Sequence, residues 1–333
     1  MPRYVLHIGP QKTGTTYLQS AFAECRPQLK ARGIEYPQLW GGAGGQYPLV
    51  ERIRAGIDLK LRAEFDELNA SDNDIVVLSS ENFVTLDDDA LRSLRRRMGG
   101  APVTVVFYCR RVSEVVRSAW QEVIKHGECM TFPDYVARYV LNPTISTVVN
   151  YCLMIDRFAA IFGADNVRLV SYNHVMDARV DLFTHFCQLF LDWPDAPLPG
   201  QKVVNQSLGM QDTEILRVLN GVEWRRPAGQ RTRLFTRYVA AKSTLQLDLV
   251  HDMIRRSVTA LEIQEDGIAL RSIHEDILAR YGSALQPPCP GGRLFVTEDV
   301  MVPYFNSHYL MEPGVIRSLR LAHAELAAMD EPS

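Results

Sequence analysis

Short apolar runs alternate with longer stretches of helical periodicity over the first 200 residues. The apolar runs cover residues 4–8 (YVLHI), 74–78 (DIVVL), 103–108 (VTVVFY) and 167–171 (VRLVS). Runs this short, which end at glycine or polar residues, are typical of strands buried on both faces. We therefore predict four buried strands.

Helical spacing fills the segments between these runs. In TTYLQSAFAEC, the residues Leu18, Phe22 and Cys25 share one face, and Pro27 breaks the pattern. Further helices are predicted near 51–69, 86–98, 113–126, 150–162 and 178–190. Because strands that alternate with helices form parallel sheets covered on both sides, we expect an α/β fold with a parallel β-sheet flanked by helices.

The alternation fades after about residue 200. Residues 205–285 are predicted to be mostly helical, PPCPGG at 287–292 breaks the chain, and a last helix is expected near 314–329. We therefore expect an α/β core over 1–200. The mainly helical region 201–333 is expected to complete the same domain and the substrate pocket.

Composition excludes several classes of protein. The 36 Lys+Arg and 39 Asp+Glu residues give a net charge of -3, and 47% of the residues are hydrophobic. This chain is too apolar to be disordered, and it lacks the basic excess of proteins that bind nucleic acid. Its six cysteines show no zinc-type spacing, so we expect reduced thiols, no metal site and a cytoplasmic location. No signal peptide and no membrane span is predicted, and the oligomeric state is left open.

The turn after the first predicted strand carries the strongest chemical signal. In HIGPQKTGTTYLQ, Gly9 and Gly14 allow the backbone to approach an anion, and Lys12 adds a full charge. Backbone N–H groups at the start of the following helix would add positive partial charge. Together with the hydroxyls of Thr13, Thr15 and Thr16, these groups predict a phosphate-binding loop.

This loop is not a Walker A loop, in which the lysine directly follows the second glycine. Here Lys12 and Thr13 precede Gly14. The arrangement resembles the 5′-phosphosulfate loop of sulfotransferases, whose form PKTGTT differs from PQKTGTT by the additional Gln11. The resemblance implies a P-loop-type sheet and a donor, 3′-phosphoadenosine 5′-phosphosulfate (PAPS), which becomes adenosine 3′,5′-bisphosphate (PAP). Residues 11–16 would hold the 5′-phosphosulfate.

Two further motifs extend the resemblance to roughly residues 4–210. The family has an Arg at a strand end and a Ser eight residues later, which bind the 3′-phosphate, and Arg110 and Ser118 match them. Tyr172, in VRLVSYNHV, matches a tyrosine near the donor nucleotide, with Asn173 and His174 where the family has an acidic pair. The segment VVNQSL at 203–208 resembles the VNxSL segment of bacterial sulfotransferases, and 291–293 (GGR) is a weak candidate for the family's C-terminal 3′-phosphate segment.

An acceptor hydroxyl needs a general base, and the leaving phosphate needs positive charge. We assign the second role to Lys12. Glu81 directly follows the strand end in LSSENF and matches the position of the base histidine in cytosolic sulfotransferases, while Ser79 replaces a lysine of that motif. A capping or solvated carboxylate is the alternative for Glu81. His7 is expected to be a core or supporting histidine, and the family's histidine-rich segment is here replaced by one that holds Gln46.

The leading hypothesis is a PAPS-dependent sulfotransferase that acts on a hydroxyl or amine of a carbohydrate, lipid or small-molecule acceptor. Its alternatives are a P-loop kinase or NTPase that uses ATP, and a non-catalytic nucleotide- or glycan-binding relative. Six aromatic residues lie in segments that could form the acceptor pocket, although such residues are more often core: Tyr36, Trp40, Tyr47, Trp120, Tyr135 and Trp224.

Overall fold

The computed structural model describes the chain except residues 39, 41–44, 57, 145, 201–207, 224–227, 296–297 and 330–333, and the side chains of 228–232. It divides into two compact units whose segments alternate along the chain. Unit 1 comprises Met1–Arg111, Asn150–Val204 and Arg271–Val296, and unit 2 comprises Val112–Val149, Asn205–Leu270 and Thr297–Ser333. The expected regions 1–200 and 201–333 are consecutive, whereas these units interleave.

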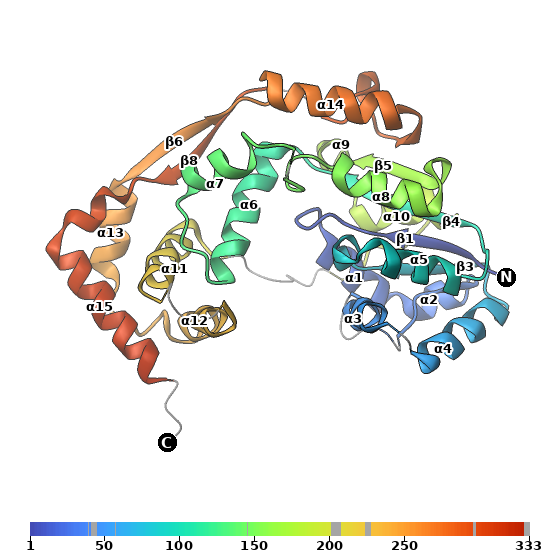
Figure 1. Cartoon of the computed structure of the whole chain (residues 1–333), viewed down its shortest axis with the longest axis horizontal. Coiled ribbons are helices and arrows are strands. Elements are labelled where there is room, and N and C mark those ends of the chain that lie inside the picture. The colour runs from blue at the N-terminus through green and yellow to red at the C-terminus, as the bar shows by residue number, and fades with distance from the viewer. Residues whose placement is uncertain are drawn as a thin grey trace. The chain divides into compact units, whose positions relative to one another are not determined.

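Unit 1 is built on a six-stranded sheet in which every neighbouring pair is parallel. The spatial order is β2-β3-β1-β4-β5-β7, and helices cover both faces (Figure 1). The strands are β1 (Arg3–His7), β2 (Ile34–Glu35), β3 (Ile75–Ser79), β4 (Val103–Cys109), β5 (Val167–Ser171) and β7 (Leu285–Gln286). The α/β fold with a parallel sheet is therefore confirmed.

The register brings the carboxyl ends of the central strands to one edge. His7 of β1 lies opposite Ser79 of β3, and Cys109 of β4 lies opposite Ser171 of β5. The residues that follow these four strands therefore start from the same edge of the sheet, where open parallel sheets bind ligands.

The two faces of the sheet are buried under different helices. On one face, α1 (Thr15–Glu24) and α10 (Leu182–Phe190) cover a core in which Phe22 meets Phe183 and Phe186 with ring centroids 5.4 and 5.1 Å apart. On the other face, Phe107 of β4 packs edge-on against Tyr151, just before α8 (Cys152–Phe162). Each such side chain contributes about 2–3 kcal/mol by leaving water.

Some helix boundaries differ from the expected ones for local reasons. The chain continues past Pro27 into α2 (Arg26–Lys30), because proline is tolerated in the first turn of a helix. The single helix expected over 51–69 is divided into α3 (Tyr47–Ala55) and α4 (Leu59–Ala70). Gly56, with φ 98°, ends the first, and the Asp58 side chain accepts a hydrogen bond from the Leu61 N–H and caps the second.

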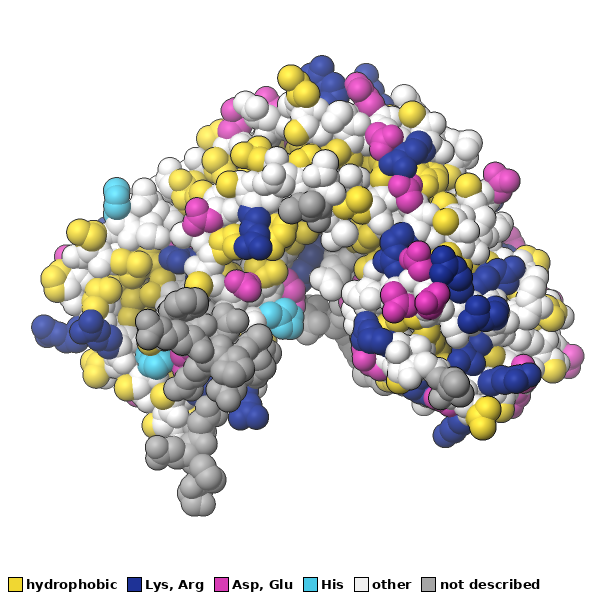
Figure 2. Space-filling view, viewed as in Figure 1, with side chains coloured by type: hydrophobic (Ala, Val, Ile, Leu, Met, Phe, Trp, Pro, Cys, Tyr) yellow, Lys and Arg dark blue, Asp and Glu magenta, His cyan; other side chains and the backbone are white. Residues whose placement is uncertain are grey.

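The remaining elements of unit 1 carry the strand-end segments. The 3₁₀ helix η1 (Glu81–Thr85) follows β3 and leads to α5 (Asp88–Arg97), and α9 (Tyr172–Asp177) directly follows β5. Most of α14 (Ile268–Tyr281) belongs to unit 1, and this helix precedes β7 in the chain. On the face shown in Figure 2, Lys and Arg side chains lie next to Asp and Glu side chains. The ion pairs of unit 1 include Arg52–Asp58 at 2.6 Å.

Unit 2 is mostly helical, as expected for the C-terminal part, although it also contains the earlier segment Val112–Val149. Its helices are α6 (Val112–Lys125), α7 (Phe132–Tyr139), α11 (Met210–Val222), α12 (Ala228–Ala241), α13 (Asp248–Arg256) and α15 (Pro313–Ala328). A two-stranded antiparallel ribbon of β6 (Val258–Ile263) and β8 (Val300–Phe305) was not predicted. Glu214 and Arg217 form a buried ion pair at 2.7 Å. The Glu214 carboxylate also accepts a hydrogen bond from the Tyr309 hydroxyl.

Candidate functional site

The loop between β1 and α1 has a backbone conformation that glycine favours. Gly9, Lys12 and Gly14 have φ values of 92°, 68° and 75°. The Thr13 hydroxyl is fully buried and donates a 2.6 Å hydrogen bond to the Pro10 carbonyl, which closes the turn. Among the described residues, no side chain caps the N-terminus of α1 at Gly14, which leaves the first N–H groups of the helix as donors for an anion.

Gly14 is required for space as well as for its positive φ. A Cβ at this position would lie 2.5 Å from Leu182 Cδ2 and 3.6 Å from Tyr172 Cε2. The loop therefore packs directly against the segment that follows β5. Of the other loop residues predicted to bind the donor, Gln11 is exposed, Thr15 is buried and Thr16 is half-buried.

Arg110 links the loop to Tyr172. Its guanidinium donates a hydrogen bond to the Lys12 carbonyl oxygen and lies over the Tyr172 ring, 5.0 Å from the centroid. The Tyr151 hydroxyl donates to the Arg110 carbonyl at 2.7 Å and fixes the backbone there. Three residues named from the sequence, Lys12, Arg110 and Tyr172, are thus brought together at the sheet edge.

Ser118 is placed differently. It lies in α6, which belongs to unit 2, and its hydroxyl donates to the Val115 carbonyl one turn earlier at 2.9 Å. Its predicted contact with a 3′-phosphate stays a prediction. Asn173, one of the residues that replace the acidic pair, accepts a 2.8 Å hydrogen bond from the Arg111 N–H through its side chain. This amide therefore ties the end of β4 to the start of α9.

Glu81 lies against the loop between β1 and α1. A Cβ on Gly9 would be 3.0 Å from Glu81 Cβ and 3.3 Å from Glu81 Cα, so the two backbones are in close contact. The carboxylate accepts hydrogen bonds from Gln19 Nε2 at 2.8 Å and from the Tyr47 hydroxyl at 2.7 Å. A carboxyl group therefore lies beside a loop whose helix N–H groups and lysine are suited to an anion.

Sequence reasoning missed the role of Gln19 and left that of Gln46 open. Gln19 lies on α1, whose inner face is otherwise largely apolar, and only 1% of its surface is exposed. Gln46 is fully buried, and its side-chain oxygen accepts a 2.7 Å hydrogen bond from the Ser79 N–H. A buried amide on an apolar helix face was the one signal that could have identified Gln19.

His7 is a core residue. It is fully buried, and its ring meets those of Tyr108 and Phe186 edge-on. Its Nδ1 lies 2.8 Å from the Ser79 hydroxyl oxygen. Burial lowers the pKa of His7 to about 3, so the imidazole is neutral at physiological pH.

The candidate segment Gly291–Arg293 returns to the same region of unit 1. His174 Nε2, on α9, lies 3.1 Å from the Arg293 carbonyl oxygen. Gly291 and Gly292 have φ values of 64° and 67°, with open space around both Cβ positions. The segment therefore lies beside the helix that starts at Tyr172. Most of the other candidate, VVNQSL, falls outside the described residues.

Most of the aromatic residues considered for the acceptor pocket are core residues. Tyr36, Trp40, Trp120 and Tyr135 are at most 2% exposed, whereas Tyr47 is 36% exposed. The Trp40 indole stacks on Phe65 and donates to Glu64. Trp224 lies outside the described residues. Tyr47 is thus the aromatic candidate that is both accessible and in contact with Glu81.

The two residues at the end of α6 have partners within unit 2. Lys125 forms a 3.1 Å ion pair with Glu122, and its ammonium lies 5.9 Å from the Phe235 ring centroid. His126 Nε2 lies 3.5 Å from the same Glu122 carboxylate. Both basic residues therefore have partners close to the C-terminal end of the helix, where positive charge is favourable.

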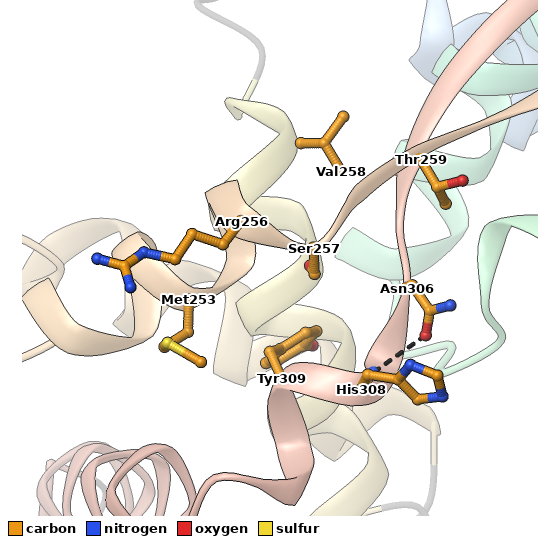
Figure 3. Close-up of a pocket in the computed structure, with 8 residues that line it drawn as sticks. All are labelled: Met253, Arg256, Ser257, Val258, Thr259, Asn306, His308 and Tyr309. Carbon is orange, nitrogen blue, oxygen red and sulfur yellow. Dashed lines mark hydrogen bonds between the residues drawn. The ribbon is translucent and has the colours of Figure 1, made fainter.

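A cavity of about 380 Å³ lies in unit 2 and is separate from the residues named from the sequence. Side chains of α13, β6 and the segment after β8 line it, among them Arg256, Thr259 and His308 (Figure 3). Arg256 forms a 2.7 Å ion pair with Asp252. The Asn306 side chain accepts a hydrogen bond from the His308 N–H at 3.1 Å.

The described residues contain neither a cluster of metal-binding side chains nor a helix that could span a membrane. No group of three or more His, Cys, Asp and Glu side chains in the described ranges is arranged to hold a metal ion. Of the helices described, none combines the length and the apolar character that a membrane span requires.

Comparison with known proteins finds similarity to a solved structure but no matching family model. No family model matches the chain, and no curated protein matches it. Among solved structures, the chain is similar to the crystal structure of a sulfotransferase from Alicyclobacillus acidocaldarius, with 15% sequence identity and a TM-score of 0.36. The match covers 68% of this chain and 99% of that chain.

Proposed function

We propose that the protein is a sulfotransferase that moves a sulfuryl group from PAPS to a hydroxyl or amine of a carbohydrate, lipid or small molecule. The observation that carries this proposal is the close contact between Gly9 and Glu81. It places a candidate proton acceptor next to a loop that combines helix N–H groups with Lys12. The sequence resemblance to the 5′-phosphosulfate loop supplies the chemical class of the donor.

The loop and Arg110 have the chemistry to bind the donor. Lys12 and the N-terminus of α1 would hold the 5′-phosphosulfate, and the guanidinium of Arg110 offers forked donors for a phosphate. Tyr172, stacked beneath that guanidinium, presents a ring that could pack on a nucleotide. Arg293 remains a candidate for the 3′-phosphate because its segment lies beside α9.

In the proposed reaction, the acceptor oxygen forms a bond to sulfur while the bond from sulfur to the bridging phosphate oxygen breaks. The proton of the acceptor hydroxyl passes to the Glu81 carboxylate, and PAP leaves with the additional negative charge. Lys12 and the backbone N–H groups of the loop stabilise that charge. Alignment of donor, sulfur and acceptor in the site supplies the remaining rate enhancement.

The test begins with calorimetric titration of the protein with PAP in the absence of Mg²⁺, where binding in the micromolar range or tighter is expected. Incubation of the protein with ³⁵S-labelled PAPS and a cell extract should then yield a labelled product that mass spectrometry can identify. Failure to bind PAP, or ATP hydrolysis that requires Mg²⁺, would favour the kinase or NTPase alternative. PAP binding without transfer to any acceptor would favour a non-catalytic relative.

A further inference from the structure

The two carboxylate oxygens of Glu81 have different partners. Gln19 Nε2 donates to Oε2 at 2.8 Å, and the Tyr47 hydroxyl donates to Oε1 at 2.7 Å. Each oxygen therefore accepts one hydrogen bond from the protein and keeps a lone pair for a second. Because both oxygens are held, rotation of the carboxylate would break two hydrogen bonds.

Both donors are held in place by their surroundings. Gln19 is 1% exposed, and Gly45 leaves the space that its amide needs, since a Cβ there would lie 2.5 Å from Gln19 Oε1. The same Gln19 oxygen accepts a longer hydrogen bond from the Tyr47 hydroxyl at 3.3 Å. The two donors are thus coupled to each other as well as to Glu81.

The segment that carries Tyr47 is also tied to the strand that carries Glu81. The Gln46 N–H donates to the Ser79 carbonyl at 3.0 Å, and the Gln46 side chain accepts from the Ser79 N–H at 2.7 Å. These two hydrogen bonds imitate the pairing of a neighbouring strand. Tyr47 and Glu81 follow these paired residues closely in sequence, and their side chains meet in the 2.7 Å hydrogen bond.

The protonation of the tyrosine fits a donor role. Burial, together with the negative charge of Glu81, raises the pKa of the Tyr47 hydroxyl well above its usual value. The phenol therefore keeps its proton and can only donate to the carboxylate. Tyr36 also faces Glu81, and burial raises its pKa despite the nearby Arg26.

We propose that Gln19 and Tyr47 are positioning residues that hold the Glu81 carboxylate in one orientation beside Gly9, where it can accept the proton of an acceptor hydroxyl. This inference rests on the proposed function. It gives a role to the segment that replaces the family's histidine-rich stretch: that segment orients the base and is not itself the base. Tyr47 keeps its own proton throughout, and the acceptor's proton ends on Glu81.

The test is a direct titration of Glu81. Protein labelled with ¹³C at the glutamate carboxyl carbons is titrated by NMR, and the Glu81 signal is assigned as the one that disappears in Glu81→Gln. Loss of one hydrogen bond to the charged form should raise the Glu81 midpoint by about one pH unit in Tyr47→Phe. Gln19→Glu should raise it further, because two carboxylates at this distance cannot both ionise easily.

Tyr281→Phe is the matched control. Tyr281 also lies in unit 1 and donates a 2.6 Å hydrogen bond to the Asp156 carboxylate, away from the Glu81 contacts. This variant should leave the Glu81 midpoint within about 0.2 pH units of wild type, which is small against the shift of about one pH unit expected in Tyr47→Phe. A midpoint that also stays at the wild-type value in Tyr47→Phe and in Gln19→Glu would overturn the positioning role.

Calorimetry with PAP separates this inference from the proposed function. Tyr47→Phe should bind PAP as wild type does, since Tyr47 contacts the base and not the phosphate loop. Wild-type protein that fails to bind PAP would sink the proposed function and leave the titration result intact. Wild-type binding together with unshifted midpoints in both variants would instead sink the positioning role alone.

Discussion

Gly9 and Glu81, at the ends of two neighbouring strands, approach so closely that a methyl group on Gly9 would lie 3.0 Å from Glu81 Cβ. A Cβ this close would force Glu81 to shift by a few tenths of an ångström. The glycine is therefore needed for two reasons, its φ of 92° and this contact. The position of the carboxylate depends on the conformation of the phosphate loop.

Gly9→Ala tests this dependence. We expect a loss of about 1–3 kcal/mol of stability from the positive φ, and a further loss of sulfuryl transfer because Glu81 is displaced. Gly100→Ala is the control, because Gly100 also has a positive φ (81°) but its Cβ would meet nothing within 4 Å. Thermal unfolding should show that both variants lose stability. In the assay of labelled sulfate transfer, only Gly9→Ala should lose more activity than its unfolded fraction accounts for.

Arg110→Ala should weaken PAP binding by about 100-fold, or about 3 kcal/mol, since it removes charged donors and frees the Lys12 carbonyl. Arg110→Lys should recover only part of this loss, because an ammonium cannot reproduce the fork or the stacking on Tyr172. Arg168→Ala, on β5, removes an arginine whose hydrogen bonds, among the described residues, go to the nearby carbonyls of Asp165 and Val167. Equal calorimetric affinities for Arg110→Ala and Arg168→Ala would contradict a donor-binding role for Arg110.

Glu81→Gln should bind PAP normally and transfer sulfate about 10²–10⁴ times more slowly, as expected when a general base is lost. Glu35→Gln is a suitable control. Glu35 also ends a strand of the sheet, but its carboxylate pairs with Lys30 at 2.9 Å. Rates are measured as labelled sulfate transferred from PAPS. An active Glu81→Gln enzyme would place the base elsewhere.

His7 should make the folded state sensitive to acid. Its pKa is about 3 in the folded protein, against about 6.5 in the unfolded chain. Between these values only the unfolded chain binds this proton, so stability falls by about 1.4 kcal/mol for each pH unit of acidification. His7→Gln removes the contribution of this histidine to the pH dependence of stability.

Urea unfolding at pH 6.5 and pH 5 measures the effect. Over this interval, His7→Gln should lose about 2 kcal/mol less stability than wild type. The variant is compared with wild type at both values, so any constant cost of the substitution cancels. An identical loss in both proteins would mean that His7 can bind a proton in the folded state.

The sheet could be predicted from the sequence where its strands are buried on both faces. The runs at 4–8, 74–78, 103–108 and 167–171 correspond to β1, β3, β4 and β5 within one or two residues at each end. The other two strands of the sheet have only two residues each, too few for any periodicity. The ribbon of β6 and β8 pairs segments about forty residues apart in sequence, and such pairing has no local signal.

Part of the candidate site could be predicted from the residues that follow the ends of the predicted strands. Lys12, Arg110 and Tyr172 follow different strands, and the parallel register brings them together. Gln19 could not be predicted in the same way, because nothing in a helical pattern indicates which buried amide meets a carboxylate from another segment. The eight-residue spacing of Arg110 and Ser118 did not indicate that these residues belong to different compact units. The roles of all these residues in binding and transfer stay predictions.

The outermost strand, β7, has a consequence for how the protein is made. It pairs with β5 but comes from residues 285–286, more than a hundred residues later in the chain. During synthesis the first 200 residues emerge with the hydrogen-bonding edge of β5 uncovered, and such an edge can pair with another chain. A fragment that ends at residue 200 would keep this uncovered edge permanently. Expression of the α/β part alone should therefore yield aggregates more readily than expression of the whole chain.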